Sequence, residues 1–464
     1  IWSSSVAIHG GSNIIYPLLG WKIHNIETIG AYILFLYYLI IILKILSIFL
    51  ALQLTKLSNL KKNYKIILFF LLSLILISFS SYEIPLNYSE LSIRDLYVVC
   101  FLICLIEAIH TNKLKIIYSV FLIIISFLSL TLHIDTAVYL YFILIIYFFY
   151  LFIQKKFYLI FKLLFTKTLL LIIFITIFGF EELFAIFKNF FIIVNNIDLI
   201  HGLEFPQPFF DTSSNSHTSR ATKIIIIQIL SGILIMESIF KKKNNHNYKQ
   251  KIIFIFLYII SFIMFKNALG RSDSYHIRMS SEWPYIISIF FFIEYIFNFL
   301  QKKISFKLVP YFIIFFLIIY LFNFKNNFNS ILNFKENFKI FLNASDDKYL
   351  KEDKTMFIND IQNIIKNEKC IINFTEDNSL LYLLKKASCT KYLIAYLSSG
   401  KKLEREYIND LKTNNTTYII FKSPAYSFDN ISINERLKIV NSYIINNYKT
   451  IYSKNNYILL EKSN

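Results

Sequence analysis

Arginine is rare in the first three-quarters of the chain, and its positions suggest anion binding. Up to residue 345 the arginines are Arg94, Arg220, Arg271 and Arg278, whereas lysine carries most of the positive charge. A guanidinium group donates paired, planar hydrogen bonds to phosphate or carboxylate, which an ammonium group cannot do. We therefore predict that Arg94, Arg271 and Arg278 bind phosphate. The alternative is that they pair with nearby acidic side chains in loops.

Acidic and histidine side chains in the same connecting segments are candidates for acid–base chemistry. Asp135 lies in a tight turn between two apolar runs, and Asp273 and His276 lie in the polar segment 270–278. Such groups can remove a proton from an acceptor hydroxyl. We predict Asp135, Asp273 and His276 as catalytic residues. For Asp135 a helix N-cap is an equal alternative, because Asp-Thr-Ala is a favourable cap sequence.

Three further polar residues, His9, Asp95 and His133, are predicted to lie at the same outer face of the membrane as these candidates. His133 with Asp135 is too generic a pair to predict a metal site. The residues identify no cofactor with certainty, and a divalent cation stays an open alternative.

The elements that must position these residues are membrane-spanning helices. Hydrophobic residues make up 56% of the 464 and charged residues 17%, and the apolar residues form long runs. A bilayer core requires about 20 apolar residues per helix. About ten helices are predicted, at 29–54, 66–81, 95–110, 116–132, 136–153, 167–187, 222–240, 251–268, 284–300 and 308–323.

Lysines in every second connection set the predicted topology. The net charge is +18, but the lysines cluster in short loops, which is typical of the cytoplasmic side of membrane proteins. This pattern argues against a nucleic-acid partner. Residue 1 and the C-terminal end are both predicted to lie outside. Lys44, inside the first span, is predicted to extend towards the cytoplasmic surface.

The C-terminal part has a different composition. From residue 346 charges of both signs become dense, which predicts an extracytoplasmic α/β domain at 346–464 after a transmembrane domain at 1–345. Its predicted strands are Ile371–Phe374, Tyr392–Ala395, Tyr418–Phe421 and Tyr457–Leu460. Cys370 and Cys389 can form a disulfide bond if this domain faces an oxidising compartment, and unpaired thiols are the favoured alternative.

Two other expectations concern an external loop and the N-terminus. In the external stretch after the sixth helix, Phe184–Ile193 is apolar with one lysine and is predicted to lie flat on the bilayer. The chain begins with Ile1, so we expect it to be truncated at its N-terminus.

Several segments resemble the GT-C class of polytopic glycosyltransferases, which includes protein mannosyltransferases and aminoarabinose transferases. They are His9-Gly10-Gly11, Tyr16-Pro17-Leu18, Ile29-Gly30-Ala31-Tyr32, Gly270-Arg271-Ser272-Asp273-Ser274-Tyr275-His276-Ile277, and in the tail 378–384, 388–390, 418–420 and 457–460. The resemblance is one of pattern rather than of a diagnostic signature.

The resemblance implies a function at the outer face of the inner or plasma membrane. Such enzymes move a sugar from a polyprenyl-phosphate donor to a glycan, lipid or protein acceptor. In the family the acid most often assigned as base lies in the first external loop, at a position that here would precede Ile1. The alternatives are a surface-polysaccharide polymerase or ligase, a lipid-linked substrate transporter or flippase, and a non-catalytic membrane scaffold.

Overall fold

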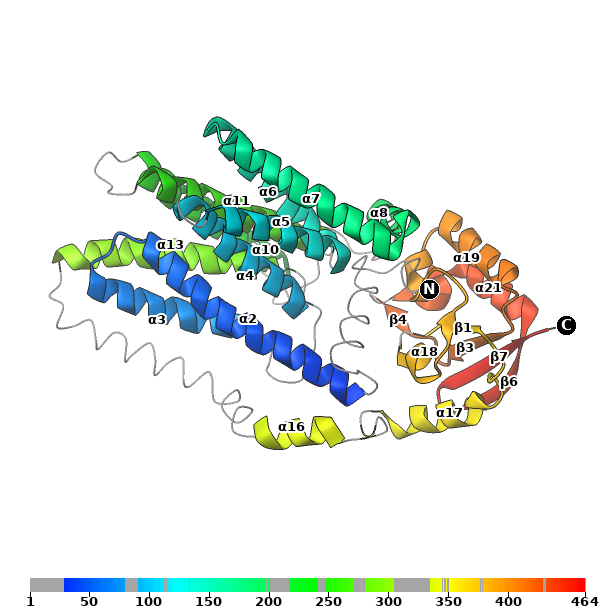
Figure 1. Cartoon of the computed structure of the whole chain (residues 1–464). Helices are drawn as coiled ribbons and strands as arrows, with labels where there is room; N and C mark the ends of the chain where they lie inside the picture. The colour runs from blue at the N-terminus through cyan, green and yellow to red at the C-terminus, as the bar shows by residue number, and fades with distance from the viewer. Residues whose placement is uncertain are drawn as a thin grey trace.

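The computed structural model describes residues 29–463 apart from 80–90, 112–114, 133, 197–198, 201–216, 241–246, 271–276, 278–279, 304–333, 344, 346–347, 349, 376, 378 and 429–430. The described chain is mostly helical, with a small sheet region at its C-terminal end (Figure 1). Its longer helices are α2 (Ile29–Leu57), α3 (Lys62–Phe79), α4 (Leu91–His110), α5 (Lys115–Leu132), α6 (Ile134–Ile153), α7 (Phe157–Phe178), α8 (Phe180–Asn195), α10 (His217–Phe240), α11 (Tyr248–Gly270), α13 (Glu282–Lys303) and α16 (Phe334–Asn343).

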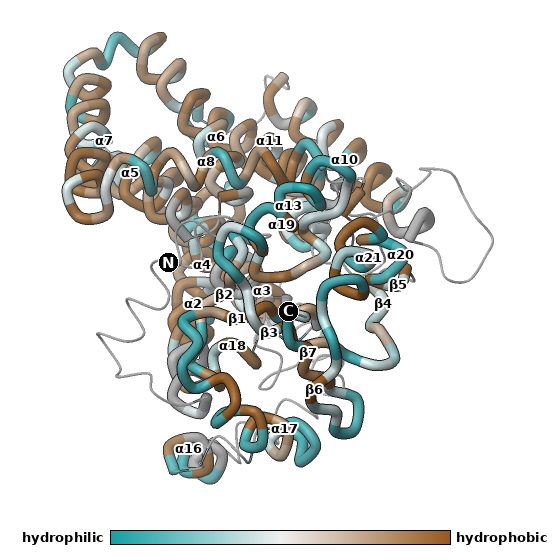
Figure 2. The backbone as a smooth tube through the Cα atoms, turned by 90° about the vertical axis from the view of Figure 1, so that its right-hand side faces the viewer, coloured by the Kyte–Doolittle hydropathy of each residue, from teal (hydrophilic) through white to brown (hydrophobic). Residues whose placement is uncertain are grey.

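Five of the described helices are long and apolar enough to cross a membrane. They contain the candidate spans Tyr38–Leu57, Thr136–Ile153, Phe157–Phe178, Tyr248–Lys266 and Glu282–Leu300. Many of their large apolar side chains point away from the bundle; in α7 Phe161 and Phe165 are among the most exposed. Because water would not tolerate so many exposed apolar groups, these helices are typical of a membrane protein. Figure 2 shows the contrast between these apolar helices and the more polar sheet region.

The predicted helices agree with the described ones except near the sixth. The predicted helix at 167–187 is wrong in both bounds, because α7 begins at Phe157 and ends at Phe178, and a separate helix, α8, follows Gly179. The interruption is the glycine, whose φ of 92° no helix accommodates. Helix 308–323 lies outside the described residues.

Lysine-bearing ends of several described helices lie together at one end of the bundle. Lys249 Nζ donates a hydrogen bond to the carbonyl of His110 (3.2 Å), and Gln250 Nε2 donates one to the carbonyl of Leu57 (3.2 Å). Lys56 lies 3.9 Å from the carboxylate of Glu107. These contacts join the ends of α2 and α4 to the start of α11, so the other ends of these helices lie on the side of the sheet region (Figure 1).

The C-terminal sheet is mixed, in the order β2-β1-β3-β7-β6. Its strands are β1 (Cys370–Asn373), β2 (Ala387–Ser388), β3 (Tyr418–Lys422), β6 (Tyr448–Lys454) and β7 (Tyr457–Lys462), and the short β4 (Ser427–Phe428) and β5 (Ile431–Ser432) form a hairpin. β1 runs parallel to β2 and β3, whereas β7 is antiparallel to β3 and β6.

Helices cover both faces of this sheet. They are α17 (Glu352–Gln362), α18 (Ser379–Leu383), α19 (Lys401–Thr413), α20 (Ile433–Arg436) and α21 (Lys438–Asn447), with the 3-10 helix η3 (Ala395–Ser398). Ile371 packs in one core with α17 and α18, and Ile372 packs in another with α19 and α21. Successive apolar residues in β1 are therefore both buried, which explains its continuous apolar sequence.

Three of the four predicted strands correspond to β1, β3 and β7. The predicted strand Tyr392–Ala395 is wrong, because Tyr392 forms only an isolated β-bridge and Ala395 begins the 3-10 helix η3. The ring of Tyr392 lies 5.9 Å from that of Tyr407. Burial of the ring, rather than strand pairing, accounts for its apolar character. β2 and β6 were not predicted. The proposed domain boundary at residue 346 stays a prediction.

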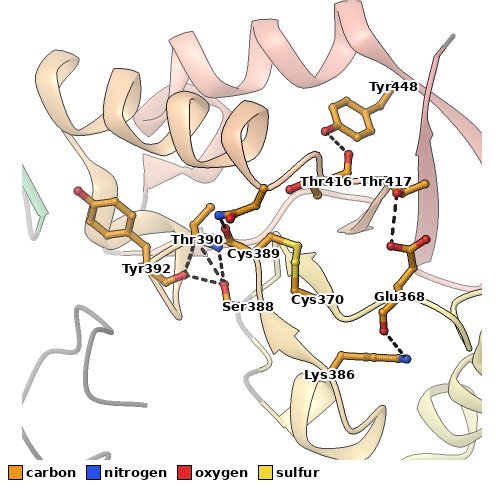
Figure 3. The surroundings of a disulfide bond; sticks show 11 residues. Glu368, Cys370, Lys386, Ser388, Cys389, Thr390, Tyr392, Thr416, Thr417 and Tyr448 are labelled. Carbon is orange, nitrogen blue, oxygen red and sulfur yellow. Dashed lines mark hydrogen bonds between the residues drawn. A yellow bond between two sulfur atoms is a disulfide. The ribbon is translucent and has the colours of Figure 1, made fainter. Parts of the chain in front are cut away.

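A disulfide bond joins the first residue of β1 to the residue after β2. Figure 3 shows this bridge between Cys370 and Cys389, so the less favoured of the two alternatives for these cysteines is the one observed. Asn414 Nδ2 donates a hydrogen bond to the carbonyl of Cys389 (2.6 Å), and so connects the bridge to the end of α19. The bridge holds the short edge strand β2 against the sheet.

We predict that replacing both cysteines in Cys370→Ser/Cys389→Ser lowers the free energy of unfolding of the sheet region by about 3 kcal/mol, because the bridge restricts the unfolded chain. Pulse proteolysis of the full chain in urea measures the change. Cys100→Ser/Cys104→Ser is the matched control, since these cysteines are free. Equal urea midpoints for the two double variants would contradict the prediction.

Candidate functional site

Arg94 and Asp95 lie inside α4 and are buried in the bundle. The sequence placed them at a helix start in an outer layer, and they do lie near the start of α4, which begins at Leu91. Arg94 is only 2% exposed and Asp95 4%. Arg94 Nη2 lies 3.5 Å from Asp95 Oδ1. Instead of facing open solvent, this ion pair lies among the helices.

The start of α13 supplies two more members of the site. Trp283 Nε1 donates a hydrogen bond to Asp95 Oδ1 (3.3 Å), and its large ring is fully buried. Glu282 is buried as well and interacts electrostatically with Asp95 and Arg94. Pro284 falls in the first turn of α13, where its missing N–H leaves no hydrogen bond unmade.

Lys44 of α2 is the fourth member of the site, and the position of its ammonium group contradicts a prediction. Its ammonium group donates a hydrogen bond to the carbonyl of Ile77, near the end of α3, and interacts with the carboxylates of Glu282 and Asp95. The prediction that Lys44 extends towards the cytoplasmic surface is therefore wrong. The two acidic side chains hold the ammonium inside the bundle, at the end remote from the lysine-rich loops.

We call Lys44, Arg94, Asp95 and Glu282 the buried charge cluster. It brings two cations and two carboxylates together from α2, α4 and α13. Taking such groups out of water costs several kcal/mol per ion unless opposite charges and hydrogen bonds compensate. Ionisable groups inside membrane helices are rare for this reason, and they mark binding or transport sites more often than structural ones.

The guanidinium of Arg94 has donor nitrogens that make no hydrogen bond within the described residues. Its Nε and Nη2 have no hydrogen-bond acceptor among the described residues, although Nη2 lies near Asp95. A buried donor without an acceptor costs about 1–3 kcal/mol, and more when it is charged. An oxygen-rich anion bound beside Arg94 would satisfy both donors. Phosphate has the right geometry, because its oxygens accept paired N–H bonds from one guanidinium.

Most other predicted site residues lie outside the described residues. These are His9, His133, Arg271, Asp273, His276 and Arg278. Asp135 lies in the first turn of α6, but its side chain is outside the described part. Their predicted roles stay predictions. Within the described ranges no group of three His, Cys, Asp or Glu side chains gathers as a metal site would require.

Two members of the cluster were missed as site residues for identifiable reasons. Lys44 was predicted to extend towards the cytoplasmic surface, because nothing in a single helix shows which face packs inward. Glu282 looked like the polar start of an ordinary helix, directly before Trp283-Pro284. A usable signal was present in the sequence, because a basic and an acidic residue each stand in a separate apolar run. Membrane helices tolerate such residues best when the two side chains pair.

Comparison of the chain with protein-family models finds no match, and comparison with curated protein sequences finds none either. The site is therefore interpreted from its own geometry.

Removing one charge from the cluster should destabilise the bundle. We predict that Lys44→Met costs about 3–5 kcal/mol, because it leaves the buried acids with less compensating charge. The double variant Lys44→Met/Glu282→Gln should cost less than the sum of the single variants, since it removes an acid together with the base. Unfolding in detergent measures both.

The control for this prediction is Lys188→Met, because Lys188 is exposed on α8 and its loss should leave stability almost unchanged. If Lys44→Met were no less stable than this control, Lys44 would not belong to a charge-compensated cluster.

Proposed function

We propose that this protein is a membrane glycosyltransferase that moves a sugar from a polyprenyl-phosphate donor to an envelope acceptor. The observation that carries the proposal is the buried guanidinium of Arg94, with two N–H groups that no described residue accepts. A lipid-linked phosphate supplies the missing acceptors from within the membrane. The resemblance to GT-C glycosyltransferases supports the same chemistry.

The cations of the cluster suit the leaving group. As the bond between the sugar and the phosphate oxygen breaks, negative charge grows on the polyprenyl phosphate. Arg94, with Lys44 nearby, stabilises that charge, and preorganised donors in a water-poor site do so more effectively than water. Arg271 and Arg278 are proposed to add further contacts, as predicted from their sequence segment.

The carboxylates suit the acceptor. One of Asp95 and Glu282 takes the proton of the acceptor hydroxyl, while the hydroxyl oxygen forms its bond to the anomeric carbon from the side opposite the phosphate. The proton ends on the carboxylate and the bonding electrons leave with the phosphate, so the sugar changes its anomeric configuration. Asp135 and Asp273 stay alternative bases.

We also propose a membrane arrangement. About ten helices cross the inner or plasma membrane, with the lysine-rich end in the cytoplasm and the sheet region outside. The grouping of lysine-bearing helix ends supports this orientation. The disulfide between Cys370 and Cys389 supports an oxidising compartment for the sheet region.

A second candidate function is transport of a lipid-linked substrate. The observation that favours it is the position of the cluster, in which Lys44 of one span faces carboxylates from two other helices. Transporters use such charge pairs within the membrane. Glycosyl transfer takes place at one face of the membrane, whereas transport moves the substrate between the two compartments that the membrane separates.

Binding of a polyprenyl phosphate tests the proposal. We predict that Arg94→Lys, which keeps the charge but loses the planar donor pair, weakens binding of a short polyprenyl phosphate by about tenfold, and that Arg94→Gln weakens it further. Native mass spectrometry of the purified chain with this lipid measures binding. Lys188→Met should bind like the unaltered chain.

Two outcomes separate the candidates. Transfer of a radiolabelled sugar from the polyprenyl-phosphate donor in detergent, where no compartments exist, would support the enzyme. Binding without transfer in detergent, together with lipid translocation in sealed vesicles, would instead establish the transporter. Unchanged binding in Arg94→Gln would contradict both assignments of the site.

A further inference from the structure

Helix α8 directly follows a helix that is long and apolar enough to cross a membrane. α7 contains 22 residues, which at 1.5 Å per residue gives about 33 Å, enough to cross a hydrocarbon core of about 30 Å. Gly179, with its φ of 92°, then ends α7 and redirects the chain. The 16 residues of α8 extend only about 24 Å, too short for a second crossing.

One side of α8 carries an exposed apolar stripe. Phe180, Phe184, Phe187, Phe191 and Val194 repeat every three or four residues, so they share one face of the helix. All are exposed, and Phe184 is 62% exposed. This stripe continues the outward-facing phenylalanines of the membrane-spanning α7 along the chain.

Polar residues form a second stripe beside the first. Glu181, Lys188 and Asn195 recur every seven residues, which places them on one line along α8. All three are exposed. A helix wholly inside lipid would not carry such a line, and a helix wholly in water would not carry the phenylalanines. An exposed arc that changes from apolar to polar is typical of a helix lying in the membrane–water interface.

The remaining face of α8 is packed against the rest of the protein. Ile186 packs with Phe127 and Leu130 at the end of α5. Further along, Ile193 belongs to the same apolar core as Leu403 of α19. The helix therefore touches the membrane bundle with one part and the sheet region with the other, as Figure 1 also shows.

Contacts just beyond α8 strengthen its connection to the sheet region. Arg436 Nη1 donates hydrogen bonds to the carbonyls of Leu199 (3.1 Å) and Ile200. Gly400 lies so close to Leu199 that a Cβ there would stand 2.9 Å from its Cδ1. The contact is with the end of the Leu199 side chain, and the φ of 110° at Gly400 is a left-handed conformation that favours glycine.

We propose that α8 lies flat in the outer surface of the membrane that the bundle crosses, with its phenylalanine stripe at the boundary between headgroups and acyl chains. The C-terminal end of α8 then holds the sheet region. The partner is the lipid surface itself. This arrangement fixes the height of the sheet region above the bilayer, and it holds whether the buried charge cluster serves transfer or transport.

Depth measurements on spin labels test this proposal. Single cysteines replace Phe184, Phe191 and Lys188 in a Cys100→Ser/Cys104→Ser background, with the chain in phosphatidylethanolamine–phosphatidylglycerol vesicles. Because all three side chains are exposed, the labels leave the packing of α8 undisturbed. Labels at 184 and 191 should be accessible to oxygen and shielded from a water-soluble nickel complex, and the label at 188 should be closer to water.

Two further positions calibrate the depth scale. Phe165→Cys, exposed in the middle of α7, reports the membrane core, and Ile445→Cys, 67% exposed on α21, reports water. The proposal requires 184 and 191 to lie between these limits. If they reach nickel as readily as 445, α8 is outside the membrane, and if they match 165, it is inside the core; either result overturns the proposal.

Discussion

The arrangement depends on one physical constraint, which is that charges inside an apolar bundle must be compensated by other charges in the same bundle. Lys44, in the middle of α2, interacts with carboxylates from α4 and α13. Its ammonium also uses the carbonyl of Ile77 near the end of α3. The relative positions of these four helices are therefore tied to a single electrostatic requirement.

The two ends of the bundle are chemically different. At one end lysines at the helix ends contact the carbonyl of His110 and the carboxylate of Glu107. At the other end Lys44 and Arg94 lie beside the acids Asp95 and Glu282, and the sheet region lies on that side (Figure 1). Such an end can bind a charged headgroup while its lipid chain stays in the bilayer. α8 connects this end to the sheet region through both of its packed ends.

The sequence predicted the regular parts of the fold well, because apolar run length and composition alone determine them. α2, α5 and α11 were found nearly at their bounds, whereas the bridge between Cys370 and Cys389 was the less favoured of two alternatives. The site was only half predicted. Arg94 and Asp95 stood out by type, but Lys44 and Glu282 become partners only when separate helices pack, and helix packing leaves no periodic signal in fully apolar runs. The break at Gly179 was missed because apolar residues continue on both sides of it.

The most direct test of the central claim is to locate the phosphate. An experimental structure of the full chain with a bound polyprenyl phosphate, determined in lipid nanodiscs, would show where the headgroup lies. The account predicts phosphate oxygens within about 3 Å of Arg94 Nε and Nη2, with Lys44 and the carboxylates of Asp95 and Glu282 lining the same space. A headgroup bound elsewhere, with the Arg94 donors satisfied by residues of the chain itself, would contradict it.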